Sequence, residues 1–514
     1  MVGGASAPGH VRKHAEGIGT VGAKQRWGRW LRIGSAVALS LTAAACGTRL
    51  PDAAFVSTGN GSGGTGTGAQ STASGAGGPS AGGVGSAGAL PGGALANTPG
   101  ASSAGGATGP TGGPTAGAAA NSAPVGGAAP AGGNGGATAV GVTAGAIEVG
   151  NIATDSGPLP GATAGAQRGA AAYFAYVNSQ GGVYGRQLHL VQGDDALDPG
   201  TARSEFLRIE PQVFAFAGSF AVADSGYVDL LKSTAIPYIG ATIDPGGRQI
   251  PTVITPQTPR APLPTNVIYS GPELYLHQQF PKANKLAFLY TNVGGVASNI
   301  AGTIAAWKSV GVQVVDTAGV DPTATDYTPE VVQARADGAT AVMCFAFEVN
   351  MIARFIQDMK QQGWQPGLSV SVLSYDSDYY KLLGSNGDGW HESEATIPYQ
   401  DPAEAAKSPE LALYREWIAR LYPNDKLDLF TVDGWADAEF FVDALKKAGP
   451  HLTWPSLLSA ARSITGFDAN GMLSPVLPTP NCFTMLMSQG GRWVRETPSQ
   501  VGGGYTCMGQ KITF

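Results

Sequence analysis

The chain has 514 residues, with 31 basic side chains against 37 acidic ones and a net charge of −6. This charge is mild and unclustered, which argues against nucleic-acid binding because that function needs a basic face. The four cysteines include no C-x-x-C pair, so neither a zinc site nor a redox motif is indicated.

An export signal is predicted over residues 1–45. Basic side chains at positions 24–32 precede the apolar stretch 33–45, which is too short to span a bilayer. Small residues then offer a cleavable site directly before Cys46, and this arrangement resembles a bacterial lipoprotein signal. Acylation of Cys46 with two or more chains would hold the protein stably at a membrane. The alternative is ordinary cleavage and release.

Residues 46–140 are predicted to form a disordered linker that starts at the lipid-anchor cysteine. From position 53 to position 146 the chain has no charged residue and almost no large apolar one. Such a segment cannot bury enough surface to offset its chain entropy. A flexible chain of about 85 residues has a root-mean-square span of roughly 50 Å, so the segment is expected to act as a tether.

The other cysteines fit an exported protein, because nearby pairs tend to be bridged in an oxidising compartment. Cys482 and Cys507 are the expected disulfide, and closing a loop of about 25 residues contributes roughly 3 kcal/mol in the chain-entropy model. Cys344 lies in the apolar run 341–347 and is expected to be a buried, unpaired thiol.

After the linker, about 370 residues of ordinary composition are more than one hydrophobic core comfortably serves, so two lobes are expected. The predicted divisions are a first lobe over 141–262, a second lobe over 263–395, a return to the first lobe over 396–470, and a C-terminal segment with the disulfide over 471–514.

Short β-branched runs alternate with longer amphipathic ones, and such repeated βαβ units predict a parallel sheet with helices on both faces. Asp198 is the expected N-cap of one helix, with proline at the first helical position. In the first lobe the predicted strands are 146–152, 187–192, 213–217 and 237–239, and the predicted helices are 160–178, the one that begins after Asp198, and 221–232.

The same rhythm restarts in the second lobe, after a proline-rich crossing at 251–264 that is predicted to be the first hinge strand. The predicted strands there are 285–290, 312–317, 341–345 and 368–373, the predicted helices are 296–310, 328–336 and 349–362, and a helical return follows at 409–421 and 431–448.

Open α/β sheets bind ligands where their strands end and where helix N-termini present unpaired N–H groups. A cleft between the two lobes is therefore expected at the carboxyl ends of both sheets. The loops expected to reach it are 155–161, 219–223, 240–244, 291–295, 345–349 and 374–378.

Several short motifs, each weak alone, carry a family resemblance through their order and spacing. They are Gln167-Arg168-Gly169, the turn Gly181-Gly182-Val183-Tyr184-Gly185, Asp194-Asp195 followed by Asp198-Pro199, and Ala217-Gly218-Ser219. Residues 147–448 resemble the branched-chain amino-acid-binding type of periplasmic binding protein, the class I solute receptors of ABC transporters. The resemblance implies an α/β fold of two Rossmann-like lobes joined by a three-stranded hinge.

The resemblance also implies a ligand site. In amino-acid-binding members, hydroxyls and backbone amides of the first lobe hold the ligand carboxylate, and an acidic residue with tyrosines of the second lobe holds the ammonium. This sequence departs from the pattern at Val222 and Ala223, where serines are expected, and at Gly294 and Gly295, where an aromatic residue is expected. The candidate ligand-binding residues are Ser156, Ser219, Phe220, Ala241, Thr242, Phe347, Tyr375 and Asp376.

Among these candidates, Asp376 is the most informative about the chemical class of the ligand. A buried carboxylate needs a cation or several donors, which favours a ligand with an amine or with hydroxyls. The aromatic candidates would supply apolar and stacking walls. The alternatives are helix capping or turn chemistry for Ser219 and Thr242, and a structural pairing with a backbone amide for Asp376. Glu348 is interpreted as a helix-entry charge.

Catalysis is disfavoured, because the histidines of the folded part form no metal-spaced pair and no nucleophile elbow lies beside them. The group Asp194, Asp195 and Asp198 is interpreted as capping rather than as a calcium or acid/base cluster. Neither a cofactor nor a metal is expected.

The expected function is an extracytoplasmic solute-binding receptor of an ABC importer, which closes by hinge motion on a small polar molecule, either an amino acid or a related compound. The expected partners are the solute, an ABC permease, and the membrane through the lipid anchor of a lipoprotein, with the receptor itself a monomer. The alternative is a ligand-sensing receptor of the same fold that is not coupled to transport.

Overall fold

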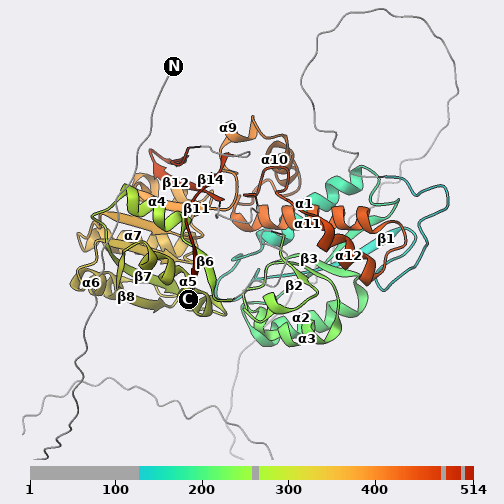
Figure 1. Ribbon diagram of the computed structural model, residues 1–514, viewed down its shortest axis with the longest axis horizontal. Helices are drawn as coiled ribbons and strands as arrows, with labels where there is room; N and C mark the ends of the chain where they lie inside the picture. The colour runs from blue at the N-terminus through green and yellow to red at the C-terminus, as the bar shows by residue number, and fades with distance from the viewer. Residues whose placement is uncertain (1–126, 257–264, 476–481, 499–503) are drawn as a thin grey trace, which may run out of the picture. The chain divides into compact units, whose positions relative to one another are not determined.

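The computed structural model describes residues 127–256, 265–475, 482–498 and 504–514, whose helices and strands form two α/β lobes (Figure 1). The predicted export signal, Cys46 and the tether up to residue 126 lie outside the described residues. Within the described ranges, every helix is too short or too polar to cross a bilayer.

The first lobe is built on a parallel sheet in the order β2-β1-β3-β4-β5. Because every pairing in this sheet is parallel, the chain must cross over between successive strands, as the βαβ pattern predicts. The strands are β1 (Ala146–Ala153), β2 (Gln187–Asp194), β3 (Ala215–Ser219), β4 (Tyr238–Gly240) and β5 (Val253–Ile254).

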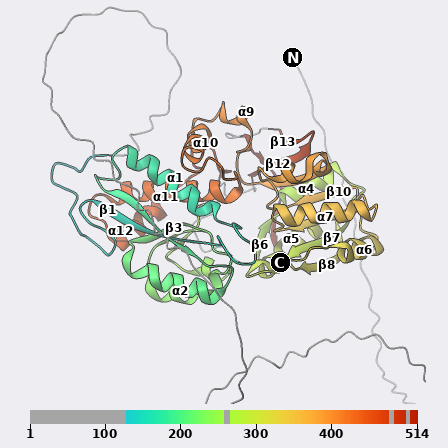
Figure 2. The ribbon, with the colours of Figure 1, turned by 180° about the vertical axis from the view of Figure 1, so that it is seen from behind.

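Helices cover both faces of this sheet. Ile147 and Val149 of β1 belong to a core with α1 and α11, whereas Ile152 belongs to a separate core with α2 and α3. Figures 1 and 2 show α1 and α11 together on one side of the sheet and α2 on the other. The helices are α1 (Gly165–Ser179), α2 (Pro199–Ile209), α3 (Val228–Thr234), α10 (Pro409–Leu421), α11 (Leu429–Ala448) and α12 (Trp454–Ser463), with short 3-10 turns at η1 (Glu210–Gln212), η2 (Asp224–Gly226) and η3 (Gly247–Gln249).

Two glycines allow α1 and α11 to pack with their backbones in contact. A Cβ atom on Gly169 would lie 2.1 Å from the carbonyl oxygen of Thr431, and one on Gly434 would lie 2.1 Å from that of Ala166. No side chain fits at either distance, so the crossing depends on glycine at both positions. This contact fixes the start of α11 against the first lobe.

The second lobe is built on a larger sheet in the order β13-β12-β11-β10-β9-β7-β8. Strands β11, β10, β9, β7 and β8 are parallel. β12 and β13 are antiparallel additions next to β11, and β14 pairs with β12. The strands are β7 (Lys285–Thr291), β8 (Gln313–Val320), β9 (Ala341–Phe345), β10 (Leu368–Ser371), β11 (Trp390–Glu394), β12 (Cys482–Gln489), β13 (Arg492–Arg495) and β14 (Thr506–Cys507).

Strand β9 shows how this sheet is buried on both faces. Val342 and Cys344 pack in the core with α6 and α7, whereas Ala341 and Met343 pack in the core on the opposite face, which is the alternation that a strand requires. Cys344 is buried and free, as predicted. The remaining helices are α4 (Gly271–Gln279), α5 (Val296–Ser309), α6 (Thr328–Ala336), α7 (Val349–Gln361), α8 (Tyr379–Leu383), the 3-10 turn η4 (Gly384–Gly387) and α9 (Pro402–Ala405).

The chain passes between the lobes three times, after β5, after β11 and after α12. The first passage includes residues 257–264, so part of the predicted hinge strand 251–264 lies outside the described residues. Beyond it, β6 (Val267–Tyr269) pairs antiparallel with β15 (Lys511–Thr513), the last strand of the chain. The disulfide predicted between Cys482 and Cys507 joins β12 to β14.

Two predicted helices are wrong in their extent. The helix predicted over 160–178 begins only at Gly165, because Thr163 folds back on Thr154 through two hydrogen bonds, Thr163 N to Thr154 O and Thr154 N to Thr163 Oγ1. The helix predicted over 221–232 is instead the turn η2 followed by α3. There the Asp224 carboxylate accepts hydrogen bonds from the backbone N–H groups of Ile243 and Asp244, which hold the segment in a loop.

Residues 127–143, assigned mostly to the predicted linker, contact the first lobe around a fully buried arginine. The Arg186 guanidinium donates to the carbonyl oxygens of Thr143 (2.7 Å), Gly136 (2.9 Å) and Pro450 (2.9 Å). These hydrogen bonds hold residues 127–143 against the first lobe. We call this segment the Arg186 strap.

Candidate functional site

A cavity lies at the carboxyl ends of the parallel strands of both lobes and leaves about 730 Å³ free of atoms, including space open to solvent. Each of the six loops expected at a cleft contributes at least one residue to its lining. The lining residues are Leu159, Ala162, Thr163, Phe220, Val222, Ile243, Thr291, Val293, Val296, Ala346, Glu348, Val349, Leu373, Tyr375, Asp376, Glu392, Glu394, Lys426, Asp428, Leu429 and Phe430.

Three of the eight candidate residues, Phe220, Tyr375 and Asp376, line this cavity. Phe220 lies edge to face with Phe430, with ring centroids 4.8 Å apart. Tyr375 packs against Tyr399 and accepts a hydrogen bond at its hydroxyl from the backbone N–H of Gln400, at 3.0 Å. Its ring therefore forms a wall whose orientation is fixed.

The other five candidates lie outside the lining. Ser219 Oγ accepts a hydrogen bond from Ile152 N at 3.1 Å, so this hydroxyl serves the strand end. Phe347 is fully buried in the second-lobe core, and the Thr242 hydroxyl is buried without a hydrogen-bond partner. Ser156 is exposed, and the Ala241 carbonyl accepts from the Tyr238 hydroxyl at 3.3 Å.

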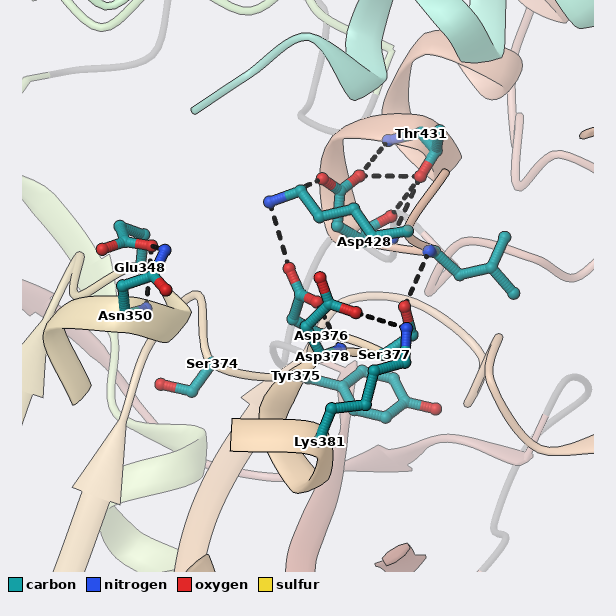
Figure 3. Close-up of polar contacts among 12 residues, drawn as sticks. Glu348, Asn350, Ser374, Tyr375, Asp376, Ser377, Asp378, Lys381, Asp428 and Thr431 are labelled. Carbon is teal, nitrogen blue, oxygen red and sulfur yellow. Dashed lines mark hydrogen bonds and ion pairs between the residues drawn. The ribbon is translucent and has the colours of Figure 1, made fainter. Parts of the chain in front are cut away.

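Asp376 is paired with a lysine of the same cavity. Lys426 Nζ lies 3.1 Å from Asp376 Oδ2 and 3.5 Å from Asp428 Oδ2. The contacts of Asp376 and Asp428 are drawn in Figure 3, where Thr431 forms a capping box with Asp428 at the start of α11. Because Lys426 is the counter-ion of Asp376, a ligand amine is not required to neutralise this carboxylate.

Burial and charge oppose each other within this group. Burial raises the pKa of the Asp376 carboxyl, and the Lys426 ammonium partly offsets that effect. Burial disfavours the charged form of Lys426, but the two carboxylates Asp428 and Asp376 together raise the pKa of its ammonium above the usual range. Lys426 is therefore protonated at neutral pH and ties a second-lobe loop to the segment that leads into α11.

A second acidic group, the pair Glu392 and Glu394, lines the cavity at the end of β11. The two are alternate residues of the strand and so point to the same face. Glu392 accepts hydrogen bonds from Ser371 Oγ (2.8 Å) and Ser374 N (3.0 Å), whereas Glu394 accepts a longer one from Thr396 Oγ1 (3.4 Å). Burial raises the pKa of both carboxyls, and the charge of Glu392 raises that of Glu394 further, so Glu394 is the more readily protonated of the two.

Sequence reasoning missed Lys426, Glu392, Glu394 and Asp428. Asp428 carries a usable signal, because an aspartate three residues before a threonine and an apolar run is an N-cap pattern that would have placed it at a helix start. The strand of Glu392 and Glu394 is an unbroken polar run from His391 to Glu394, without the apolar residues that mark a buried strand, and nothing near Lys426 in the sequence indicates a cleft.

The capping interpretation of Asp198 and the helix-entry interpretation of Glu348 are confirmed, whereas Asp194 accepts from loop backbone groups. Asp198 Oδ1 caps α2 by accepting from Thr201 N at 2.7 Å, and Glu348 accepts from two N–H groups at the start of α7. Asp194 Oδ1 accepts from the backbone of Asp155 and Ala196, at 2.9 Å each. Across the described ranges no cluster of His, Cys, Asp and Glu has the arrangement of a metal site.

Two α/β lobes with one cavity at the ends of both sheets define a two-lobed solute-binding protein. The family model of the periplasmic binding proteins matches residues 146–484, and the chain belongs to that family. Periplasmic binding proteins act outside the cytoplasm. Among curated proteins there is no match to the chain.

Solved structures with the same fold include a fatty acid ABC transporter substrate-binding protein from Thermomonospora curvata, at 19% identity and a TM-score of 0.56 over 73% of this chain and 95% of that one. An extracellular ligand-binding receptor from Verminephrobacter eiseniae has 19% identity and a TM-score of 0.57 over 68% of this chain and 99% of its own. A possible leucine/isoleucine/valine-binding protein from Rhodopirellula baltica has 14% identity and a TM-score of 0.56, over 69% and 96% of the two chains. The type I fold with two lobes is therefore confirmed.

Proposed function

We propose that the protein is the solute receptor of an ABC importer and that it binds a small molecule, an amino acid or a related compound, in the cavity between the strand ends of its two lobes. The observation that carries this proposal is the lining of the cavity. The loops of the first lobe supply Phe220 and Val222, and the loops of the second lobe supply Tyr375 and Asp376.

A ligand that contacts both lobes stabilises the closed arrangement relative to the open one, and this differential affinity drives hinge closure. An ABC permease in the membrane is the proposed partner of the closed form. We also propose that acylated Cys46 anchors the receptor as a lipoprotein, that residues beyond the anchor act as a tether, and that the receptor is a monomer without a cofactor.

Ligands are found by thermal-shift screening of the full mature chain against amino acids, amides, amines and short carboxylic acids. A ligand that binds the folded form alone raises apparent stability by about 2.7 kcal/mol at a hundred times its dissociation constant. We expect at least one of these classes to raise the melting temperature.

Closure is then measured as a distance between two spin labels. Leu207 of α2 and Val332 of α6 are exposed residues on different lobes, and cysteines at both positions in a Cys46→Ser background carry the labels. A ligand that raises the melting temperature is expected to shift the distance distribution. If every stabilising ligand leaves the distribution unchanged, hinge closure is wrong.

A further inference from the structure

We infer that the cavity takes a small organic cation, a primary amine with an apolar body and no carboxylate, and that the pair Glu392 and Glu394 receives the ammonium. This inference names the solute class and so rests on the proposed receptor function. It assigns the specificity to residues other than Asp376, the acidic position implied by the family resemblance.

The first argument is the charge balance of the lining. One ammonium, that of Lys426, stands against five carboxyl side chains, which are Glu348, Asp376, Glu392, Glu394 and Asp428. Even with Glu394 protonated, the carboxylates outnumber the single ammonium. In a partly buried cavity such charges act at low effective dielectric, so a ligand carboxylate is repelled and a ligand cation is attracted.

The second argument is which of these carboxyl groups already have partners. Glu348 accepts hydrogen bonds from the N-terminus of α7, and Asp376 and Asp428 share Lys426. Within the described residues, neither Glu392 nor Glu394 forms an ion pair with a basic side chain. An unpaired buried charge is costly, and protonation of a carboxyl of the pair lowers that cost.

A ligand ammonium can replace that proton. Ser371 Oγ and Ser374 N hold the Glu392 carboxylate in place. Glu394 shares a hydrogen bond with Glu392 and has a long contact from Thr396, so its carboxyl group keeps acceptor capacity. As the ammonium enters, the pair releases its proton to water and becomes the counter-ion of the ligand. The exchange takes place inside the cavity, so the ammonium gains a strong, charge-assisted contact.

The buried carboxylate of Asp428 also agrees with a donor-bearing ligand. Asp428 Oδ2 is buried, lines the same cavity and accepts no hydrogen bond; its nearest cation, Lys426 Nζ, is 3.5 Å away. A second N–H of a ligand ammonium could satisfy this oxygen. Buried oxygens without a donor are rare in folded proteins and call for such an explanation.

The rest of the lining favours an apolar body, and the donors of Thr163, Thr291 and Lys426 are already used. The hydroxyls of Thr163 and Thr291 already donate to the carbonyl oxygens of Phe220 and Ala346. Lys426 is already held by two aspartates. Most other lining residues are aliphatic or aromatic, so an amine with a hydrocarbon body fits better than a zwitterion.

The test uses four probes that share one hydrocarbon body: 3-methylbutylamine, 3-methylbutanol, 3-methylbutanoate and leucine. A second set with a benzyl body covers a larger ligand. Titration calorimetry of the full mature chain at neutral pH is expected to show the amine of at least one set binding at least tenfold more tightly than its alcohol, acid and amino acid. If an acid or an amino acid binds as tightly as the matching amine, the inference is overturned while the receptor function stands.

The residue assignment is tested with Glu394→Gln and, as a second variant, Glu392→Gln. Each is expected to weaken amine binding at least tenfold and to leave alcohol binding unchanged, with the melting curve confirming that the variant folds. The matched control is Glu439→Gln, a buried carboxyl of α11 that bonds to Asn470 and lies outside the lining. Equal losses in the variants and the control would overturn the assignment. Failure of every solute to bind would overturn both the inference and the receptor function.

Discussion

Lys426 is one residue on which both the stability and the electrostatics of the cavity depend. Replacing it in Lys426→Met leaves Asp376 and Asp428 buried without their cation. Breaking a buried pair in this way is strongly destabilising, so we expect the free energy of unfolding to fall by about 3 kcal/mol in urea denaturation. The control is Lys407→Met, whose exposed ion pair with Glu404 should contribute less than about 1 kcal/mol. Equal stability of the two variants would contradict the prediction.

Glu273 makes stability depend on pH. Burial raises the pKa of its carboxyl from 4.5 to about 7, and Oε2 has no hydrogen-bond partner. Between these two pH values the folded protein keeps a proton that the unfolded chain has lost, so stability falls as pH rises from 4.5 to about 7 and then levels off.

Glu273→Gln should remove that fall. At pH 8 the variant is expected to be more stable than the parent by roughly 2 to 3 kcal/mol, and at pH 4 the two should be similar. Urea denaturation at several pH values measures the difference. Glu416→Gln, an exposed residue of α10, is the control and should show no such trend. A pH-independent difference between Glu273→Gln and the parent would refute this account.

Only some residues of the candidate site could be predicted from the sequence. Tyr375 and Asp376 could be placed because the loop after a parallel strand reaches the cleft whatever the rest of the chain does. Lys426 and Glu394 could not be placed, because their positions depend on how the second passage and the edge of the second sheet pack. Such contacts are long-range and leave no local pattern.

Among the elements, the crossing of α1 and α11 is the most sensitive to substitution. In Gly434→Ala the added Cβ would lie 2.1 Å from the Ala166 carbonyl oxygen, so the helices must separate. We expect a loss of about 2 to 3 kcal/mol in thermal or urea unfolding. In the control Gly200→Ala of α2, the Cβ meets only Asp198 Oδ1 at 3.1 Å, and stability should change by less than about 1 kcal/mol. A neutral Gly434→Ala would mean that the helix pair is loosely packed.

The elements that periodicity predicts best are those whose burial is one-sided or complete along their whole length. The bounds predicted for α6, β9 and α10 agree with the structure. The wrong extents at 160–178 and 221–232 share one feature, since an apolar residue of each segment, Ala162 or Val222, lines the cavity instead of a helix face. β12 and β13 were not predicted because antiparallel additions at a sheet edge lack the βαβ rhythm.

For the molecule as a whole, the C-terminal strands complete the second lobe. β12 continues the sheet next to β11, the strand that carries Glu392 and Glu394, and the disulfide between Cys482 and Cys507 closes this region. Replacing both cysteines in Cys482→Ala/Cys507→Ala should lower the free energy of unfolding by about 3 kcal/mol. Thermal unfolding with and without a reductant measures this loss. The melting temperature of the parent protein in reductant should equal that of the variant. A variant as stable as the oxidised parent would contradict it.

The Arg186 strap determines which lobe would bear a force applied to the chain at residue 127. Its hydrogen bonds end on the first lobe, at Arg186 itself and, through Gly127, at the turn Gly182–Gly185. A pull on residue 127 would therefore be borne by one lobe and would not strain the passages between the lobes. An attached receptor could then open and close as freely as a released one.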